Sequence, residues 1–295
     1  MQPGLDRDIR WLRLGHATCN AARAVALVIG VFLALAWTPA RADGFDRTHA
    51  AWSALLAKHV VLIDAGKASQ VSYAGFAADR AALAAYLGAV SAVTPAELES
   101  WPRADQMAFL INAYNAFTIE LILTRYPDLK SIRDLGNVVF NSPWKRRFFT
   151  LLGRPQHLDG IEHETLRKAG VYDEPRIHFA VNCASVGCPM LREEAYVGSR
   201  LDAQLEDQTR RFLADRSRNR YSTERAALEV SPIFDWYRQD FESGYGGVRS
   251  REQFFARYAA LLADRPDERA AIASGKVPLR FLEYDWRLND VPRAK

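Results

Sequence analysis

The sequence predicts an α+β fold, a helix-rich single domain packed on a small, mainly antiparallel sheet. Apolar residues recur at helical spacing over most of the chain, and only a few short segments have the apolar pattern of strands. No change in composition marks a domain boundary after residue 43. The roughly 250 residues that follow are enough to enclose a substantial core.

The first 42 residues are predicted to be a secretory signal peptide. Four arginines accompany an apolar run, 24–37, which is shorter than the roughly 20 residues that span a membrane. Pro39-Ala40-Arg41-Ala42 then offers a small-x-small cleavage pattern, with cleavage after Ala42. An uncleaved N-terminal anchor is the alternative. Cleavage would leave residues 43–295 in the periplasm or outside the cell, with no stable membrane span.

The charge of the chain argues against a nucleic-acid partner. The whole chain has 39 basic and 35 acidic residues. Five arginines and two aspartates of this total belong to the predicted leader. The remaining chain therefore has a net charge of +1, which offers no basic excess to neutralise phosphates.

Helices are predicted for the first half of the domain, over residues 43–63, 73–92, 95–101 and 105–126. The last of these is apolar almost all round, so it should be buried at the centre of the domain. Asn112 and Asn115 lie on one face of it. Because a buried amide without partners is costly, the pair should either brace a neighbouring loop or line a polar pocket.

The second half alternates short strands with helices. The pattern predicts a hairpin over 151–158, a helix from Asp159 to Gly170, a strand over 177–182, a helix over 193–212, a strand over 227–230, a helix over 251–262 and a terminal strand over 277–286. Glu162 and His163 are adjacent in a predicted helix, so only one of them should point squarely into a site.

The stretch 176–189, RIHFAVNCASVGCP, holds the strongest candidate site. In an extended strand His178 and Asn182 would share a polar face, while Ile177, Phe179 and Val181 would face the core. That face should meet the helix that carries Asn112 and Asn115. The same alternation separates His178 from Cys183.

Three hypotheses account for the cysteines of this stretch. Cys183 or Cys188 could be a thiolate nucleophile, with His178 as its base and an asparagine to orient the imidazole. The two cysteines with His178 and His163 could hold zinc, although C-x4-C is not a strong zinc spacing. In an oxidising compartment they could instead form a disulfide beside a cleft that only binds. Ser185 lies between them and belongs to the same candidate site.

Five segments in this order resemble the domain-of-unknown-function 547 family, over about 98–289: AFLINAYNAFTI, LDGIEHETLR, RIHFAVNCASVGCP-x-LR, IFDWYRQDF and FLEYDWRLND. Bacterial members of this family look like exported or envelope-associated proteins, and the resemblance implies no established activity. It also suggests a distant similarity to papain-like and transglutaminase-like folds, in which the central helix opens with a cysteine. Here that helix has Asn112 and Asn115 and no cysteine.

The function predicted from these residues is a hydrolase- or transferase-like activity on a peptide or amide. Its candidate catalytic residues are His178, Cys183 and Asn112, with binding by Asn115, Asn182, Ser185, Glu162 and His163. The alternatives are a non-enzymatic envelope binding module with a Cys183–Cys188 disulfide, and a zinc-binding protein. No cofactor is predicted. A small molecule or peptide is the expected partner, and the sequence makes no prediction of oligomeric state.

Overall fold

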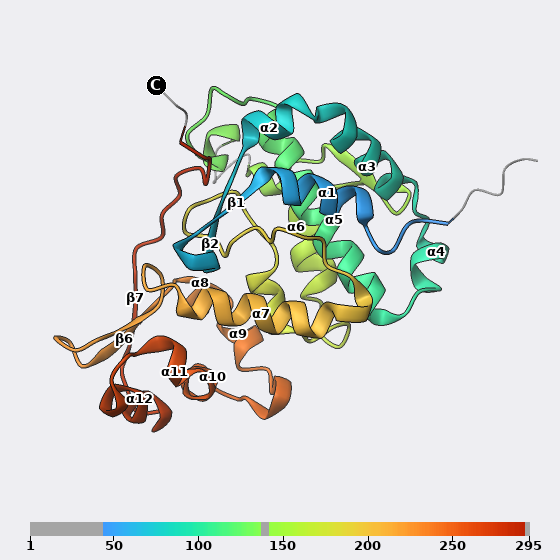
Figure 1. The fold of residues 1–295 in the computed structure, drawn as a ribbon. Helices are drawn as coiled ribbons and strands as arrows, with labels where there is room; N and C mark the ends of the chain where they lie inside the picture. The colour runs from blue at the N-terminus through green and yellow to red at the C-terminus, as the bar shows by residue number, and fades with distance from the viewer. Residues whose placement is uncertain (1–43, 137–141, 293–295) are drawn as a thin grey trace, which may run out of the picture. The chain divides into compact units, whose positions relative to one another are not determined.

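The computed structural model of the protein describes residues 44–136 and 142–292. Residues 43–295 form one compact unit (Figure 1). The predicted signal peptide, 1–42, lies outside the described residues, so export stays a prediction. The helices are α1 (Ala50–His59), α2 (Tyr73–Ala78), α3 (Arg80–Ala92), α4 (Pro95–Glu99), α5 (Arg103–Leu123), α6 (Leu158–Ile161), α7 (Leu201–Ala214), α8 (Ile233–Trp236), α9 (Arg238–Phe241), α10 (Arg251–Arg257), α11 (Ala259–Leu262) and α12 (Pro266–Ala273).

The strands are short and form small sheets. Antiparallel pairs join β1 (Val60–Ile63) to β2 (Ala68–Val71) and β3 (Phe149–Leu151) to β4 (Arg154–Gln156). In a third sheet, β6 (Ala227–Val230) lies between antiparallel β5 (Arg220–Ser222) and parallel β7 (Leu279–Phe281). The predicted α+β class, mainly antiparallel, is confirmed. Within the described residues the strands form three separate sheets rather than one, and each strand has only three or four residues.

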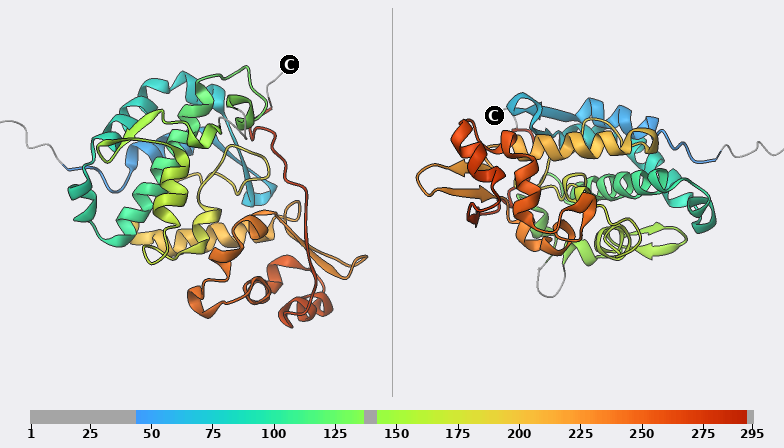
Figure 2. Two further views of the ribbon diagram at one scale, coloured as in Figure 1. Left: turned by 180° about the vertical axis from the view of Figure 1, so that it is seen from behind. Right: turned by 90° about the horizontal axis from the view of Figure 1, so that it is seen from below.

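Helix α5 is the centre of the larger hydrophobic core. Almost every residue from Met107 to Leu123 is buried, and helices α2, α3 and α6 pack against it (Figures 1 and 2). Among the described residues it is the one helix that is long and apolar enough to cross a membrane, but most of that apolar stretch is already buried inside the protein. The prediction of a buried central helix is confirmed.

The two buried asparagines of α5 brace the chain around the candidate site. Asn112 donates to the Tyr196 carbonyl at 2.7 Å and accepts from the Tyr196 N–H at 3.0 Å. Asn115 donates to the Ala180 carbonyl at 2.9 Å and accepts from the Asn182 N–H at 2.8 Å. Each amide thus replaces a strand partner for a segment of irregular backbone, which could not otherwise be buried at low cost.

A second, smaller core is rich in phenylalanine. It is built mainly from α7 to α12 and the β5–β6–β7 sheet, and it contains Phe179, Phe212, Phe234, Phe241, Phe254 and Phe255. Figure 2 shows α10, α11 and α12 gathered at the opposite end from α4. Ile177 belongs to the larger core and Phe179 to the smaller one. The candidate site stretch therefore runs along the boundary between the two cores.

Two predicted elements near the site are wrong. Residues 177–182 do not form a strand; Pro175–Phe179 is a 3-10 helix whose first turn is capped by the Glu174 carboxylate. Pro175 favours this geometry because its fixed φ suits the first helical position. The predicted helix over 193–212 begins only at Leu201, after the 3-10 turn Gly198–Arg200. Before that turn, Asn112 of α5 bonds the backbone of Tyr196, and Gln204 of α7 accepts from the Val197 N–H.

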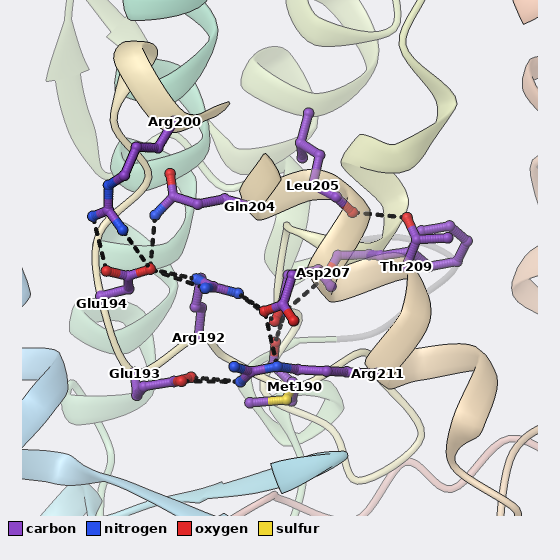
Figure 3. A network of polar contacts seen from close by, with 12 residues as sticks. Met190, Arg192, Glu193, Glu194, Arg200, Gln204, Leu205, Asp207, Thr209 and Arg211 are labelled. Carbon is purple, nitrogen blue, oxygen red and sulfur yellow. Dashed lines mark hydrogen bonds and ion pairs between the residues drawn. The ribbon is translucent and has the colours of Figure 1, made fainter. Parts of the chain in front are cut away.

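Helix α7 fastens the segment that follows the site (Figure 3). Arg192 donates to Glu194 at 2.9–3.0 Å and also pairs with Asp207 of α7. Arg211 of the same helix reaches Glu193 at 2.9–3.0 Å. In addition, Gln208 donates to the Phe179 carbonyl at 3.2 Å and to the Met190 carbonyl at 3.1 Å, which pins both ends of the intervening stretch.

We expect Asn115→Ala to lower the free energy of unfolding by about 3 kcal/mol, because it leaves the Ala180 carbonyl and the Asn182 N–H buried without partners. Thr118→Val is the matched control on the same helix: its hydroxyl bonds only to the Tyr114 carbonyl, one turn back. That change should cost less than about 1.5 kcal/mol. Urea denaturation compares the two variants. Equal losses would contradict the bracing role.

Candidate functional site

A cavity of about 210 Å³ opens where the two cores meet. It combines flat apolar surfaces with several groups that can carry or transfer protons. Its aromatic lining comes from Tyr114, Trp144, Trp236, Tyr237, Tyr284 and Trp286. Its ionisable lining comes from Asp159, Glu162, His163, His178, Cys183 and Cys188. Such a mixture, in a concave site, is typical of a ligand or active site.

His178 is held rigidly at the inner wall of this cavity. Its Nε2 lies 2.7 Å from Asp240 Oδ2, and its ring stacks on Tyr237 with centroids 3.8 Å apart and planes at 16°. Burial lowers the pKa of His178, and the hydrogen bond to Asp240 only partly offsets this effect. The imidazole is therefore neutral, with its proton on Nε2, where it donates to Asp240.

The other nitrogen of His178 is buried and has no hydrogen-bond partner within the described part of the chain. The nearest carboxylate oxygen, Glu162 Oε1, is 4.0 Å from Nδ1. In the tautomer set by Asp240, Nδ1 carries a lone pair. A buried acceptor without a partner is costly, so a bound molecule that donates a hydrogen bond to Nδ1 would gain free energy.

Asp240 is fixed from its other side by Arg167. The Arg167 Nε donates to Oδ2 at 2.6 Å and Nη2 donates to Oδ1 at 3.2 Å. Burial alone would raise the pKa of Asp240, but the hydrogen bonds from His178 and Arg167 outweigh it and lower that pKa to about 2. Asp240 is thus an anion at neutral pH. The arginine also lies over the ring of Tyr237, 4.6 Å from its centroid.

Glu162 and His163 come from a π-helical turn, Glu162–Leu166, which continues α6. Glu162 is buried, and beyond its proximity to His178 it hydrogen-bonds the Tyr237 hydroxyl. Burial and this carboxylate together raise the pKa of Tyr237. His163 lies at the exposed margin and hydrogen-bonds Arg167 at 2.9 Å. Both side chains line the cavity, but Glu162 is buried in its wall whereas His163 stays partly exposed.

Cys183 and Cys188 also line the cavity, but they differ in exposure. Cys183 is partly exposed and its Sγ lies 3.2 Å from the Tyr284 hydroxyl. Cys188 is buried, and its Sγ accepts the Cys183 N–H at 2.9 Å. The two cysteines are free thiols, so the predicted disulfide is not formed in this structure.

The environment makes the two thiols unequal acids. The Cys188 thiol hydrogen-bonds Cys183, and together with a hydrogen bond from Tyr284 it lowers the pKa of Cys183 although burial opposes this change. Burial, followed by the neighbouring Cys183, raises the pKa of Cys188. Cys183 is thus the more acidic thiol of the pair and the one more readily converted to the nucleophilic thiolate.

The sequence of the central part of the chain agrees with a known family. Residues 98–213 match the family described as "Protein of unknown function, DUF547". The match spans 116 of the 295 residues, which is less than half of the chain. This result confirms the predicted resemblance over that range. Searches of curated proteins and of solved structures found no match.

The DUF547 match includes part of the cavity only. His178, Cys183, Cys188, Glu162 and His163 lie inside 98–213, whereas Tyr237, Tyr284 and two of the three tryptophans of the lining lie beyond it. Asp240, which bonds His178 without lining the cavity, also lies beyond it. The predicted extent to residue 289 is therefore longer than the match. The segments IFDWYRQDF and FLEYDWRLND nevertheless complete the cavity, because Trp236, Tyr237, Tyr284 and Trp286 belong to its lining.

The structure separates the remaining predicted site residues from the cavity. Asn112 and Asn115 bond to backbone, as described above. Asn182 donates to the Pro189 carbonyl at 2.7 Å and accepts from the Ala184 N–H at 3.0 Å. Ser185 is buried and forms an isolated backbone bridge with Leu288. None of these four lines the cavity. The predicted His178–Asn182 face is wrong because it depended on an extended strand.

His178 and Cys183 share the cavity, but no hydrogen bond joins them among the described residues. Likewise, within those residues no group of three or more His, Cys, Asp and Glu side chains is arranged to hold a metal ion, so the zinc hypothesis gains no support. The sequence analysis overlooked Asp240, Arg167, Tyr237 and Tyr284. One signal was available: acidic residues interrupt an otherwise aromatic segment at 233–241.

We predict that the Asp240 carboxylate stabilises the fold only above acidic pH. Its pKa, about 2 when folded, lies below the unfolded value of about 3.9. Its contribution, about 2 kcal/mol, should thus be complete above pH 4 and lost as the pH falls through 2. Asp240→Asn should lower the free energy of unfolding at pH 7 by about that amount, and the difference from wild type should shrink in acid.

Denaturant titrations at several pH values measure this difference. Asp264→Asn serves as a control, since that side chain is 90% exposed and should change stability by less than about 0.5 kcal/mol. A difference between Asp240→Asn and wild type that stays constant from pH 7 to pH 2 would contradict the pairing of Asp240 with His178 and Arg167.

Proposed function

We propose that the protein is a thiol-dependent hydrolase or acyltransferase that acts on an amide or a related acyl compound. The single observation that carries this proposal is that one cavity is lined by a partly exposed thiol, Cys183, and by His178. The Nε2 of His178 is bonded to Asp240, and its Nδ1 has no hydrogen-bond partner among the described residues. A nucleophile, a base and a group that orients the base are the components of covalent acyl transfer.

The proposed reaction begins with transfer of the Cys183 proton to His178 Nδ1. Because no hydrogen bond joins the two side chains, one water molecule or the substrate relays the proton. The Asp240 carboxylate stabilises the imidazolium that forms. The thiolate attacks the acyl carbon, a C–S bond forms, and the imidazolium returns its proton to the leaving amine as the C–N bond breaks.

The second half of the reaction regenerates the thiol. A water molecule loses a proton to Nδ1 and attacks the thioester carbon. The C–S bond breaks, the carboxylic acid leaves, and Cys183 recovers the proton. The sum is an amide and water converted to an acid and an amine, whereas an acceptor amine or alcohol in place of water gives acyl transfer. The aromatic lining is suited to the apolar part of a small molecule or peptide.

The second candidate function is a binding module without catalysis. It is favoured by the aromatic side chains at the cavity: Trp236 is 48% exposed, and it stacks on Trp286 with ring centroids 5.9 Å apart. Exposed tryptophans that share a surface are typical of ligand contacts. In this case Cys183 would contribute only polar surface, and no covalent intermediate would form.

4-Nitrophenyl acetate tests the catalytic proposal. We expect the wild type to release a burst of nitrophenol and then turn over, with an acetyl group on Cys183 detected by mass spectrometry. Cys183→Ala should abolish both. The His178→Gln variant should still be acylated at high pH. Its thioester should be hydrolysed 10²- to 10⁴-fold more slowly, which is roughly the contribution of general base catalysis to the rate.

Glu164→Gln is the control, because this side chain is exposed on the same turn as Glu162 and does not line the cavity. It should leave the burst and the turnover unchanged. Turnover that survives Cys183→Ala would refute the proposal. Binding of small aromatic compounds without any acylation of the wild type would favour the binding module instead.

A further inference from the structure

A tight turn brings the two cysteines of the cavity together. The Cys188 N–H donates to the Ser185 carbonyl at 3.0 Å, and Ala184 adopts the left-handed region with φ of 63°. The chain thereby folds back, so that the Cys183 N–H donates to Cys188 Sγ at 2.9 Å and the two thiols hydrogen-bond each other. Few residues separate the cysteines, so little chain must move for their sulfurs to bond.

The pair is also asymmetric in a way that suits a sequential redox reaction. Cys183 is partly exposed in the cavity and contacts Tyr284, whereas Cys188 is only 4% exposed and lies behind it. An oxidant that enters the cavity therefore reaches Cys183 first. The buried thiol is protected from the oxidant but lies next to the sulfur that is oxidised, which is the place of a resolving cysteine.

We propose that Cys183 and Cys188 form a reversible thiol–disulfide pair, in which Cys183 reduces a hydroperoxide and Cys188 resolves the product. This inference shares the reactive Cys183 thiolate with the proposed function, but it does not depend on acyl transfer. Oxidation would occupy the sulfur that attacks the substrate, so the disulfide form would be inactive as an acyltransferase or hydrolase.

The steps balance as follows. The Cys183 thiolate attacks one oxygen of the hydroperoxide ROOH, and the O–O bond breaks. The sulfur gives up two electrons and becomes a sulfenic acid, while RO⁻ takes a proton and leaves as ROH. Cys188 then loses its proton and attacks Cys183 Sγ, the S–O bond breaks, and hydroxide leaves as water after it is protonated. An external dithiol reduces the disulfide by exchange and is itself oxidised to a disulfide.

Hydrogen peroxide tests the proposal on the purified protein with Cys19→Ser, which leaves Cys183 and Cys188 as its only cysteines. After reduction and removal of the reductant, one equivalent of peroxide should convert most molecules to the Cys183–Cys188 disulfide. Non-reducing peptide mass spectrometry identifies it by the loss of two hydrogens. Dithiothreitol should restore both thiols and the nitrophenol burst.

Two variants assign the roles of the cysteines. With Cys188→Ala, peroxide should leave a sulfenic acid on Cys183 that dimedone traps. With Cys183→Ala, Cys188 should react at least tenfold more slowly because it is buried. The proposal is overturned if the wild type forms no disulfide, or if Cys188→Ala gives no trapped sulfenic acid while wild type oxidises.

The outcome separates this inference from the proposed function. If the reduced wild type is acylated by 4-nitrophenyl acetate but peroxide produces no disulfide, only the redox inference fails. If the disulfide forms and is reduced again but no acylation occurs, only the proposed acyl transfer fails. Both readouts use the same protein preparation.

Discussion

The hydrogen bond between His178 and Asp240 is the interaction on which the candidate site depends. It joins a residue inside the DUF547 match to a residue beyond it, and it crosses the boundary between the two hydrophobic cores. The side chains of the neighbouring Ile177 and Phe179 pack into different cores, and this packing fixes the backbone at His178. Asp240 then sets the tautomer at the ring, and Tyr237 fixes its plane by stacking.

The loop that carries the cysteines is held by a different set of contacts. It lacks regular secondary structure, so side-chain amides supply the partners that a sheet would provide. Asn115 holds its beginning, Asn182 spans its interior, and Gln208 ties Phe179 to Met190. These amides come from α5, from the loop itself and from α7. An irregular buried loop of this kind holds its functional groups in place only while every backbone group is satisfied.

The sequence was sufficient to predict the fold class, the central helix, the strand 227–230 and the stretch 176–189 as the centre of the site. These features depend on apolar periodicity and on local clusters of His, Asn and Cys. It was not sufficient to predict the backbone geometry of this stretch. A capped turn that begins at a proline replaces the expected strand, so the side chains that share a face differ from those predicted. Asp240 and Tyr284 were not predicted for another reason. Asp240 lies 62 residues from His178 and Tyr284 lies 101 residues from Cys183 in the sequence, and only tertiary packing brings each pair together. The asparagines were correctly identified as needing buried partners, and of the two roles considered they take the bracing one.

The central claim is that Asp240 holds His178 neutral, with its proton on Nε2 and a lone pair on Nδ1. Two-bond ¹H–¹⁵N correlation spectra of the imidazoles measure this directly, with His178→Gln to assign the signals. At neutral pH we expect a protonated Nε2 and a pyridine-like Nδ1 for His178, and Asp240→Asn should disturb this state. A His178 ring protonated on Nδ1, or on both nitrogens, would contradict the account.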